Sequence, residues 1–382
     1  MNILLISHGI PSKEDPQWGC FEMDQAIALS KEGHSITVAA IDGRFRKHYR
    51  KIGITRGSYG NIRTFLYYFI PQKVFVFSWL KRKSRELMMT RLVGRIIREQ
   101  GLPDLIYAHY LFNIGDLCQI KRQYPYIPVV GMEHWSELLR SKLLRRVESL
   151  ARVAYHTADR VLVVSPALQS RLKQYFGVDS DVVYDMVDSV FLQTPIPKVR
   201  LNNPFTYVSC GSLIPRKGFD ILIRAFARLQ DRNSRLIIIG DGELRGELRD
   251  LCQELSVADR VSITGRIDRE AIAGIMTISS AYVLASRSET FGVSYIEALA
   301  MGLPVIATRC GGTDSFFSED CGLMVDVDDV AGLTAAMDRM EETVASYQAE
   351  GLREYIRSRF SGDVIAKQLE KFFEEEIKAK NK

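Results

Sequence analysis

The 382-residue sequence lacks several features that would place it in a restricted class of proteins. No apolar run approaches the roughly 18–20 residues of a transmembrane helix, so no ordinary membrane-spanning helix is expected. The six cysteines are scattered without a C-x-x-C pair, which disfavours a disulfide framework or a zinc site and is typical of a reducing cytosol. Residues 1–8 lack the positive charge of a signal peptide and indicate a first core strand instead.

Charge is modest overall but unevenly placed. The net charge is +5, and the apolar and charged shares of 46% and 25% are those of ordinary globular proteins. Between Arg44 and Gln100, however, fifteen lysines and arginines stand against two acids within 57 residues. The length indicates two or three domains.

Apolar runs and amphipathic stretches alternate along the chain, which predicts parallel sheets covered on both faces. Expected strands in the first half lie at 2–7, 35–41, 104–109, 127–133 and 160–165, with a helix at 21–32. A proline- and asparagine-rich linker is expected at 187–204. Beyond it, strands are expected at 205–209, 235–239, 261–264, 281–285 and 305–308. Ligands of such sheets bind beyond the carboxyl ends of the strands.

Two segments past predicted strand ends carry the strongest chemical signals. Gly211–Gly218 is a glycine turn before a helix, with Arg216 and Lys217 beside it, which suits a diphosphate; a solvated basic turn is the alternative. In 286–304, Glu289 lies in a loop and Glu297 in the next helix, and carboxylates at such places suit sugar hydroxyls. A capping box from Ser294 to Glu297 is the alternative there, but it does not explain Glu289.

Weaker signals surround these two. Gly311-Gly312 permits close approach of a ligand or makes a plain turn. Gly240-Asp-Gly242 resembles a dinucleotide fingerprint, but the spacing of the third glycine fails, which disfavours a nicotinamide cofactor. Three histidines fall at predicted strand ends and are either polar site residues or ordinary strand-end residues, and no ligand spacing favours a metal: His8, His109 and His134.

The pattern S-x-x-E-T-F-G followed by I-E-A-x-A-x-G-x-P-V-I-A-T-x-x-G-G, from Ser286 to Gly312, resembles the signature of the retaining glycosyltransferases of family four (glycosyltransferase group 1). The resemblance is strong over 205–340 and weaker in the first half. It implies an α/β GT-B architecture with two Rossmann-like domains facing across a cleft. The implied domains are an acceptor-binding one at 1–190, a nucleotide-sugar-binding one at 191–355, and a helical segment at 356–382 that packs back towards the first.

The resemblance also implies residue roles. Arg216 and Lys217 hold the donor diphosphate, Glu297 binds the ribose hydroxyls, and Glu289 contacts the donor sugar. His109 lies near that sugar and, with Glu289, Arg216 and Lys217, forms the catalytic set. Other implied donor contacts are Gly19, Gly211, Arg266, Ile267, Phe291, Gly292 and Val293, and the implied acceptor side holds Glu133 and His134. Family members often carry two glycines in the first loop, whereas this sequence has only Gly19 there.

The implied reaction is transfer of a sugar from a nucleoside-diphosphate sugar to a saccharide or lipid-linked acceptor, in bacterial polysaccharide or lipopolysaccharide synthesis. Glu289 and Glu297 already have binding roles, so a same-face transfer assisted by the leaving phosphate is expected, without an obligatory metal. The alternatives are an NDP-sugar epimerase of similar fold and a nucleotide-sugar-binding scaffold. The basic region alone would permit nucleic-acid binding, but no recognition motif supports it.

The basic region also carries two aromatic runs, at 65–70 and 74–80. Basic residues beside an apolar aromatic face are typical of a peripheral membrane contact. We therefore expect residues 44–100 to contact an anionic membrane surface, and the protein to be cytoplasmic and peripheral on the inner face of the plasma membrane. The alternative is that the aromatic runs form a core strand and a buried loop.

Overall fold

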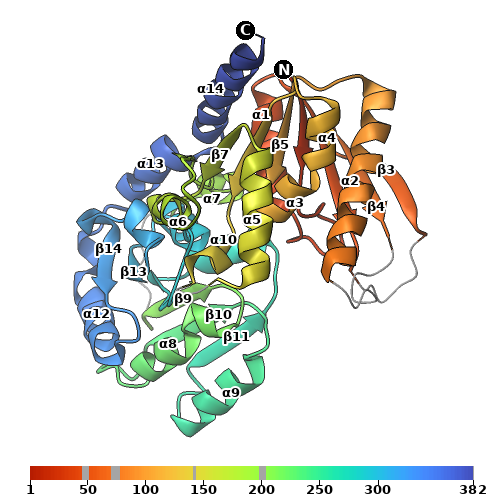
Figure 1. Cartoon of the computed structure of the whole chain (residues 1–382). Coiled ribbons are helices and arrows are strands. Elements are labelled where there is room, and N and C mark those ends of the chain that lie inside the picture. Colours follow the sequence, from red (N-terminus) through yellow and green to blue (C-terminus); the bar gives the residue numbers. More distant parts are fainter. Residues whose placement is uncertain (45–50, 70–77, 141–142, 198–203, 382) are drawn as a thin grey trace. The chain divides into compact units, whose positions relative to one another are not determined.

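The structure, a computed structural model, describes residues 1–44, 51–69, 78–140, 143–197 and 204–381. The chain forms two compact units (Figure 1). The first comprises Met1–Met186 together with the C-terminal residues from Gly362 onward, and the second comprises Val187–Ser361. Each unit is described by itself below.

The first unit is built on an eight-stranded sheet in the order β3-β4-β2-β1-β5-β6-β7-β8. Neighbouring strands are parallel except β3 and β4, which form an antiparallel hairpin. Strands β5 and β6 are buried along their whole length, as expected for central strands covered on both faces. The strands are β1 (Asn2–Ile6), β2 (Ser35–Asp42), β3 (Gly53–Tyr59), β4 (Ile62–Tyr68), β5 (Leu105–His109), β6 (Val129–Glu133), β7 (Arg160–Val163) and β8 (Asp181–Val182).

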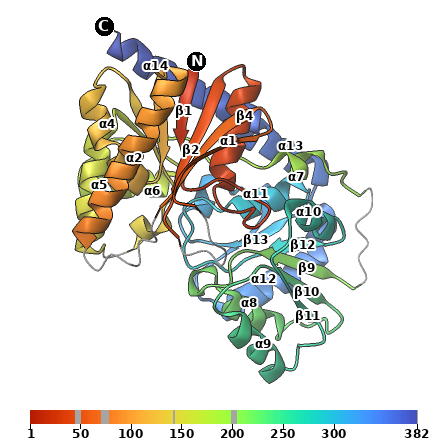
Figure 2. The ribbon, with the colours of Figure 1, turned by 90° about the vertical axis from the view of Figure 1, so that its right-hand side faces the viewer.

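Helices cover both faces of this sheet (Figure 2). Helices α2 (Ser78–Gln100), α3 (Leu111–Asp116), α4 (Cys118–Gln123) and α5 (Arg145–Thr157) pack together on one face. Helix α1 (Cys20–Lys31) lies on the other face and packs against α14 (Gly362–Lys380). Helix α6 (Pro166–Phe176) connects β7 to β8. The C-terminal helix α14 is thus part of the first unit, and Arg160 ties it down through ion pairs with Glu375 and Glu376.

The second unit contains a six-stranded, fully parallel sheet in the order β11-β10-β9-β12-β13-β14. Its strands are β9 (Thr206–Cys210), β10 (Arg235–Ile239), β11 (Val261–Gly265), β12 (Ala281–Val283), β13 (Val305–Thr308) and β14 (Gly322–Val325). Its α-helices are α7 (Ser189–Gln193), α8 (Phe219–Phe226), α9 (Arg245–Glu254), α10 (Arg269–Thr277), α11 (Val293–Ala300), α12 (Val330–Thr343) and α13 (Ala349–Phe360). Because the strands are parallel, their carboxyl ends share one edge of the sheet.

Each strand that the sequence predicts is present, in two α/β units that are each built on a largely parallel sheet. The hairpin β3–β4 and strands β8 and β14 were not predicted, and the predicted linker carries the short helix α7. The interpretation of 65–70 as part of an exposed apolar face is wrong for the described residues. Phe65 and Tyr67 are buried in β4, and Phe69 is buried just beyond it. Because β4 pairs with β2 inside the sheet, these alternate side chains pack into the core of the first unit. Residues 74–77 of the second aromatic run lie outside the described residues.

Candidate functional site

The carboxyl edge of the second unit's sheet brings together the segments that the sequence singled out. Gly211 follows β9, Arg266 and Ile267 follow the edge strand β11, and the loop with Glu289 follows β12. Arg266 is exposed and Ile267 is half-buried. The parallel strands therefore bring segments up to about a hundred residues apart in sequence to one edge.

Two cations converge on one buried carboxylate at this edge. Lys217 Nζ lies 2.6 Å from Glu289 Oε1, and Arg216 Nη1 lies 3.2 Å from Glu289 Oε2. The Ser286 hydroxyl donates a third hydrogen bond to Glu289 Oε1, at 2.6 Å. Arg216 also donates to the carbonyl of Ser288, at 2.7 Å. The carboxylate holds both cations at defined positions, and the trio keeps one net positive charge.

The cations determine the charge state of Glu289. Burial alone would raise the pKa of its carboxyl, but the charges of Lys217 and Arg216 lower the pKa below its ordinary value. Glu289 is therefore ionised at neutral pH although its side chain is only 5% exposed. A carboxylate stabilised by two cations is a weak base and a weak nucleophile.

Glycine at position 218 lets the cationic loop reach the end of β12. Its φ is +62°, in the left-handed region. A Cβ atom there would lie 1.9 Å from the carbonyl oxygen of Ala285, a distance that no side chain tolerates. The backbone of Arg216 then accepts a hydrogen bond from the N–H of Arg287, at 2.8 Å. Loop and strand end are locked together, which positions Arg216 and Lys217 beside Glu289.

The N-terminus of α11 lies in the same loop region. Gly292 is the N-cap residue, with φ +101°, and Phe291 before it is fully buried. The capping-box alternative is wrong, because the helix begins at Val293 and the Ser294 hydroxyl instead accepts a hydrogen bond from Tyr282 at 2.8 Å. Glu297 lies in the second turn of α11, not the first, and is 9% exposed. The burial of Glu297 therefore needs an explanation other than helix capping.

The double glycine after β13 shapes the Glu289 loop. A Cβ atom on Gly312 would lie 2.6 Å from the carbonyl oxygen of Glu289, and Glu289 forms an isolated parallel bridge with Gly311. Glycine is required at 312 because two backbone segments touch there, and at 311 because its φ is +98°. The sequence predicts either a ligand contact or a plain turn here, and the close approach that the structure shows is to the chain's own loop.

The first unit also has a polar edge on its own sheet, at the carboxyl ends of β1, β5, β6 and β8. His109 ends β5 and is fully buried, and its Nδ1 lies 2.8 Å from His134 Nε2. His134 Nδ1 lies 3.1 Å from Asp185 Oδ1. His8, after β1, is exposed, and its backbone N–H donates to the buried Glu22 at 2.9 Å. The structure thus brings together His109 and His134, whose side chains the sequence could only place at one edge.

Glu133 lies behind this histidine pair, and its hydrogen-bond donors are all neutral groups. Its carboxylate accepts hydrogen bonds from the backbone N–H groups of Leu111, His134 and Trp135 and lies 3.3 Å from the hydroxyl of Tyr155. Burial raises its pKa to about 7, although these hydrogen bonds oppose the shift. Its many internal partners indicate that Glu133 holds the strand end in shape.

Several residues of this edge escaped sequence reasoning. Asp185 and Glu22 are both buried, but neither belongs to a motif. Tyr110, directly after His109, has φ +67° and ψ +140°, a strained conformation that non-glycine residues rarely adopt outside functional sites.

The predicted donor contact Gly19 has φ +80°, and a Cβ there would lie 2.2 Å from the carbonyl oxygen of Gly9, so close backbone packing explains this glycine.

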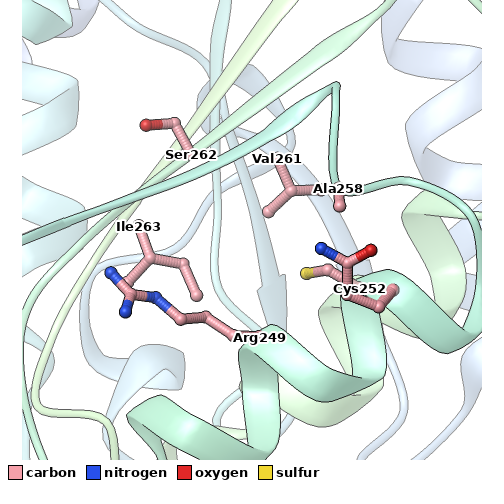
Figure 3. A pocket seen from close by; sticks show the side chains of 7 residues that line it. Arg249, Cys252, Ala258, Val261, Ser262 and Ile263 are labelled. Carbon is pink, nitrogen blue, oxygen red and sulfur yellow. The ribbon is translucent and has the colours of Figure 1, made fainter.

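A hollow of about 320 Å³ lies elsewhere on the second unit, between α9 and the beginning of β11 (Figure 3). Arg249 and Cys252 line it from the helix, and Val261, Ser262 and Ile263 line it from the strand. Burial raises the pKa of the Cys252 thiol to about 11, so the thiol is inert at neutral pH. The hollow is away from the strand ends and contains none of the predicted site residues.

The described residues contain neither a metal-binding cluster nor a membrane-spanning helix. No group of three or more histidine, cysteine, aspartate or glutamate side chains within them is arranged to hold a metal ion. None of the described helices combines the length and apolar composition needed to cross a bilayer.

Comparison with known proteins identifies relatives of both halves of the chain. Residues 195–359 match the family model of glycosyl transferases group 1, and residues 23–191 match that of glycosyltransferase family 4. The chain is 28% identical to the putative teichuronic acid biosynthesis glycosyltransferase TuaC of Bacillus subtilis, over 97% of both chains. It is 31% identical to the lipopolysaccharide core biosynthesis glycosyltransferase LpsD of Rhizobium meliloti, over 56% of this chain and 63% of LpsD.

Among solved structures, the fold matches Anabaena HepE in complex with UDP-glucose. The TM-score is 0.74 at 20% identity, over 98% of this chain and 100% of HepE. At that identity the likeness establishes the fold, which is the two-domain α/β GT-B type that the sequence predicts.

Proposed function

Because the chain belongs to the group 1, family four glycosyltransferases, we propose that it transfers a sugar from a nucleoside-diphosphate sugar to a saccharide or lipid-linked acceptor of the bacterial cell surface, with retention of configuration. The observation that carries the donor half of this proposal is the pair Arg216 and Lys217, held on Glu289 at the strand edge. The acceptor half is supported by the relatives TuaC and LpsD, which are named for teichuronic acid and lipopolysaccharide core synthesis.

The cation pair fits the chemistry of the departing diphosphate. Negative charge grows on the leaving group in the transition state, and cations already fixed in place stabilise it without reorganisation. Arg216 and Lys217 are fixed in this way by Glu289. They would supply the positive charge, so we propose that no metal is obligatory. The other proposed donor contacts are Gly211, Arg266, Ile267, Glu297 and the backbone N–H groups of Phe291, Gly292 and Val293.

Retention is supported by the state of Glu289. A double-displacement mechanism would need a free carboxylate nucleophile, but three side chains already engage Glu289 and its pKa is lowered. A same-face transfer, in which the leaving phosphate helps to deprotonate the acceptor, needs no such group. We assign His109 to the sugar and His134 to the acceptor side, with Glu133 as support.

The test begins with a panel of UDP-, GDP- and ADP-sugars in thermal-shift titrations of the full chain. A ligand that binds only the native state at 100 times its Kd stabilises it by about 2.7 kcal/mol. One nucleotide class should raise the melting temperature, and Glu297→Gln should reduce that rise by half or more at the same ligand concentration. NMR should then show that the sugar, when first transferred or released, has the same anomeric configuration as in the donor. An inverted product would reject retention, a released donor epimer would favour an epimerase, and no binding by the whole panel would reject the donor site.

The basic region at residues 44–100 suggests that the protein binds its acceptor at a membrane surface. In α2, five residues at four-residue spacing are all exposed and form one stripe: Trp79, Lys83, Leu87, Arg91 and Arg95. Trp79 is 62% and Leu87 43% exposed, which is uncommon for such large apolar side chains. Apolar anchors alternating with cations suit an anionic membrane surface. We propose that this α2 stripe binds the cytoplasmic face of the membrane, which would bring a lipid-linked acceptor to the first unit.

Sedimentation with anionic vesicles tests the α2 stripe. Each basic residue near such a surface contributes about 1 kcal/mol, so Lys83→Glu/Arg91→Glu should release the protein at low salt. The matched control is Lys367→Glu/Lys371→Glu, which makes the same charge change at exposed positions of α14 in the same unit. Equal loss in both variants would indicate net charge rather than the stripe, and no binding of the wild type would reject the membrane contact.

A further inference from the structure

Three side chains at the carboxyl edge of the first unit form a continuous polar chain. Asp185 Oδ1 lies 3.1 Å from His134 Nδ1, and His134 Nε2 lies 2.8 Å from His109 Nδ1. The two imidazole rings are nearly parallel, with an interplanar angle of 12°, and their centroid separation of 5.1 Å is compatible with a hydrogen bond between the ring edges. His109 Nε2, at the far end, is buried and has no hydrogen-bond partner among the residues that the structure describes.

We infer that Asp185 and His134 are positioning residues that set whether His109 Nε2 accepts or donates a hydrogen bond. A neutral imidazole has one donor and one acceptor nitrogen, and an ionised carboxylate only accepts. With the Asp185 carboxylate 3.1 Å from Nδ1, a neutral His134 is most stable with its proton on Nδ1, so that Nε2 accepts. His109 then donates from Nδ1, and its Nε2 carries a lone pair.

Uptake of one proton reverses this arrangement. When a proton binds His109 Nε2, the proton on His109 Nδ1 passes to His134 Nε2. His134 is then the cation, paired with the Asp185 carboxylate and donating to His109, and His109 Nε2 has become a donor while His109 itself stays neutral. One proton enters, and one N–H bond breaks as another forms. The charge therefore rests on His134 although the proton enters at His109.

The surroundings favour this division of charge. Burial lowers the pKa of His109 well below its ordinary value, and the charge of His134 lowers the pKa further. Burial also opposes a charged His134, but Asp185, Glu22 and Glu133 more than offset it and raise the pKa of His134 above 6.5. These acids approach His134 from three directions, on the segment after β8, on α1 and on β6.

Uncharged groups complete the surroundings. The Tyr107 ring lies 4.5 Å from the His109 ring, and the Tyr110 ring lies 5.2 Å from the His134 ring. Burial raises the pKa of both phenols well above 10, so neither titrates with the histidines. Glu133, with a pKa of about 7, can titrate in the same range, and its protonation would lower the proton affinity of His134.

The inference rests on the proposed function only for the identity of the group that meets His109 Nε2, which would be a sugar hydroxyl. At high pH Nε2 would accept that hydroxyl's proton, and at low pH it would donate to the hydroxyl oxygen. The switch itself belongs to the free protein and is measured without any sugar. Failure of the switch and failure of the proposed function are therefore distinguishable.

The experiment is a pH titration of ¹⁵N-histidine-labelled full-length protein, read through the ring nitrogen shifts, which distinguish protonated from lone-pair nitrogens. His109 and His134 are assigned from the variants His109→Gln and His134→Gln. We expect His109 Nε2 to change from lone pair to N–H as the pH falls through a midpoint above 6.5, together with protonation of His134. A protonated Nε2 at high pH, or a His109 indifferent to the titration of His134, would overturn the inference.

Two substitutions separate positioning from general structure. Asp185→Asn removes the nearest negative charge, so the midpoint should fall by one pH unit or more, a tenfold loss of proton affinity. The matched control, Asp159→Asn, breaks the ion pairs with Lys121 and Lys380 in the same unit and should lower the melting temperature without moving the midpoint. An unmoved midpoint in Asp185→Asn would reject the role of Asp185, and a midpoint moved equally by Asp159→Asn would indicate a general structural effect.

The pH profile supplies the link to activity. If the proposed function holds, the pH dependence of kcat/KM should contain the wild-type midpoint, and Asp185→Asn should shift it in step with the NMR midpoint. Glu133→Gln should keep the switch, because it removes only one of the three acids. A shifted NMR midpoint with an unchanged kinetic profile would show that the switch exists but does not serve transfer.

Discussion

The two units place buried carboxylates at equivalent edges of their sheets, but they neutralise them differently. Glu289 in the second unit faces two cations, which lower its pKa despite burial. Glu133 in the first unit faces backbone N–H groups and a tyrosine, and burial raises its pKa to about 7. The ionic edge suits a charged ligand such as a diphosphate. The edge with neutral donors and histidines suits hydroxyl groups and proton exchange.

The largest expected effect comes from removing one cation of the ionic edge. Lys217→Ala should lower kcat/KM by about 10²-fold or more, because a cation at developing charge acts mainly in the transition state. Arg216→Ala should behave similarly. Arg224→Ala, an exposed arginine of α8, is the matched control and should leave kcat/KM unchanged. The measurement is steady-state kinetics with the donor found in the panel. Activity retained in both Lys217→Ala and Arg216→Ala would reject the diphosphate role.

The ionic edge also shows how far sequence reasoning reaches. The loops after β9 and β12 could be assigned to one edge because parallel strands end together, and Arg216, Lys217 and Glu289 all lie in those loops. Their mutual contact could not be predicted, because residues more than seventy positions apart meet only once the strand order is known. Asp185 was missed for a different reason: a buried acid outside any motif has no sequence signature.

The same limits apply to the fold. Strands with clear apolar runs were predicted within one residue at each end, except that β7 and β12 end two residues early and β6 begins two residues late. The hairpin β3–β4 was not predicted because its basic residues are typical of a charged surface. In β4, Phe65 and Tyr67 lie on the same face of the strand and are buried. Strand β8 has only two residues, too few for a periodic pattern.

The raised pKa of Glu133, in the first unit, should make the free energy of unfolding depend on pH. The carboxyl of Glu133 has a folded-state pKa of about 7 against an ordinary 4.5. The folded state therefore binds the proton more tightly, and its stabilisation is complete below about pH 4.5 and is lost as the pH rises through 7. Relative to Glu133→Gln, the wild type should lose about 3 kcal/mol of unfolding free energy over that range.

Urea denaturation of both proteins from acid to neutral pH measures this difference. The matched control is Asp363→Asn, which removes an exposed carboxylate of the same unit and should show no such trend. A difference between wild type and Glu133→Gln that does not vary with pH would mean that the backbone donors fully offset burial. The contrast with Glu289 would then disappear.

A smaller effect is expected from the second carboxylate of the ionic edge. Glu297→Gln should keep the fold and lose roughly 1.5–3 kcal/mol of donor binding, about a 10- to 100-fold rise in Kd, because a charged acceptor is replaced by a neutral one. The melting temperature should stay near that of the wild type, because Gly292 is the N-cap of α11 and Glu297 takes no part in capping it. Calorimetric titration decides: unchanged donor affinity with a lower melting temperature would make Glu297 a purely structural residue.

The smallest effect, and the direct counterpart of the Glu133 experiment, concerns Glu289 in acid. Because the cations lower its folded-state pKa below the ordinary 4.5, its stabilisation is present above about pH 4.5 and is lost as the pH falls through the lowered value. The wild type should therefore exceed Glu289→Gln in stability by a constant amount at neutral pH, and the difference should shrink only in the acid limb. Added salt should reduce the difference only slightly, because the ion pairs are largely buried. Urea denaturation across both limbs makes the measurement, and a difference that shrank towards neutral pH instead would place Glu289 in the same class as Glu133.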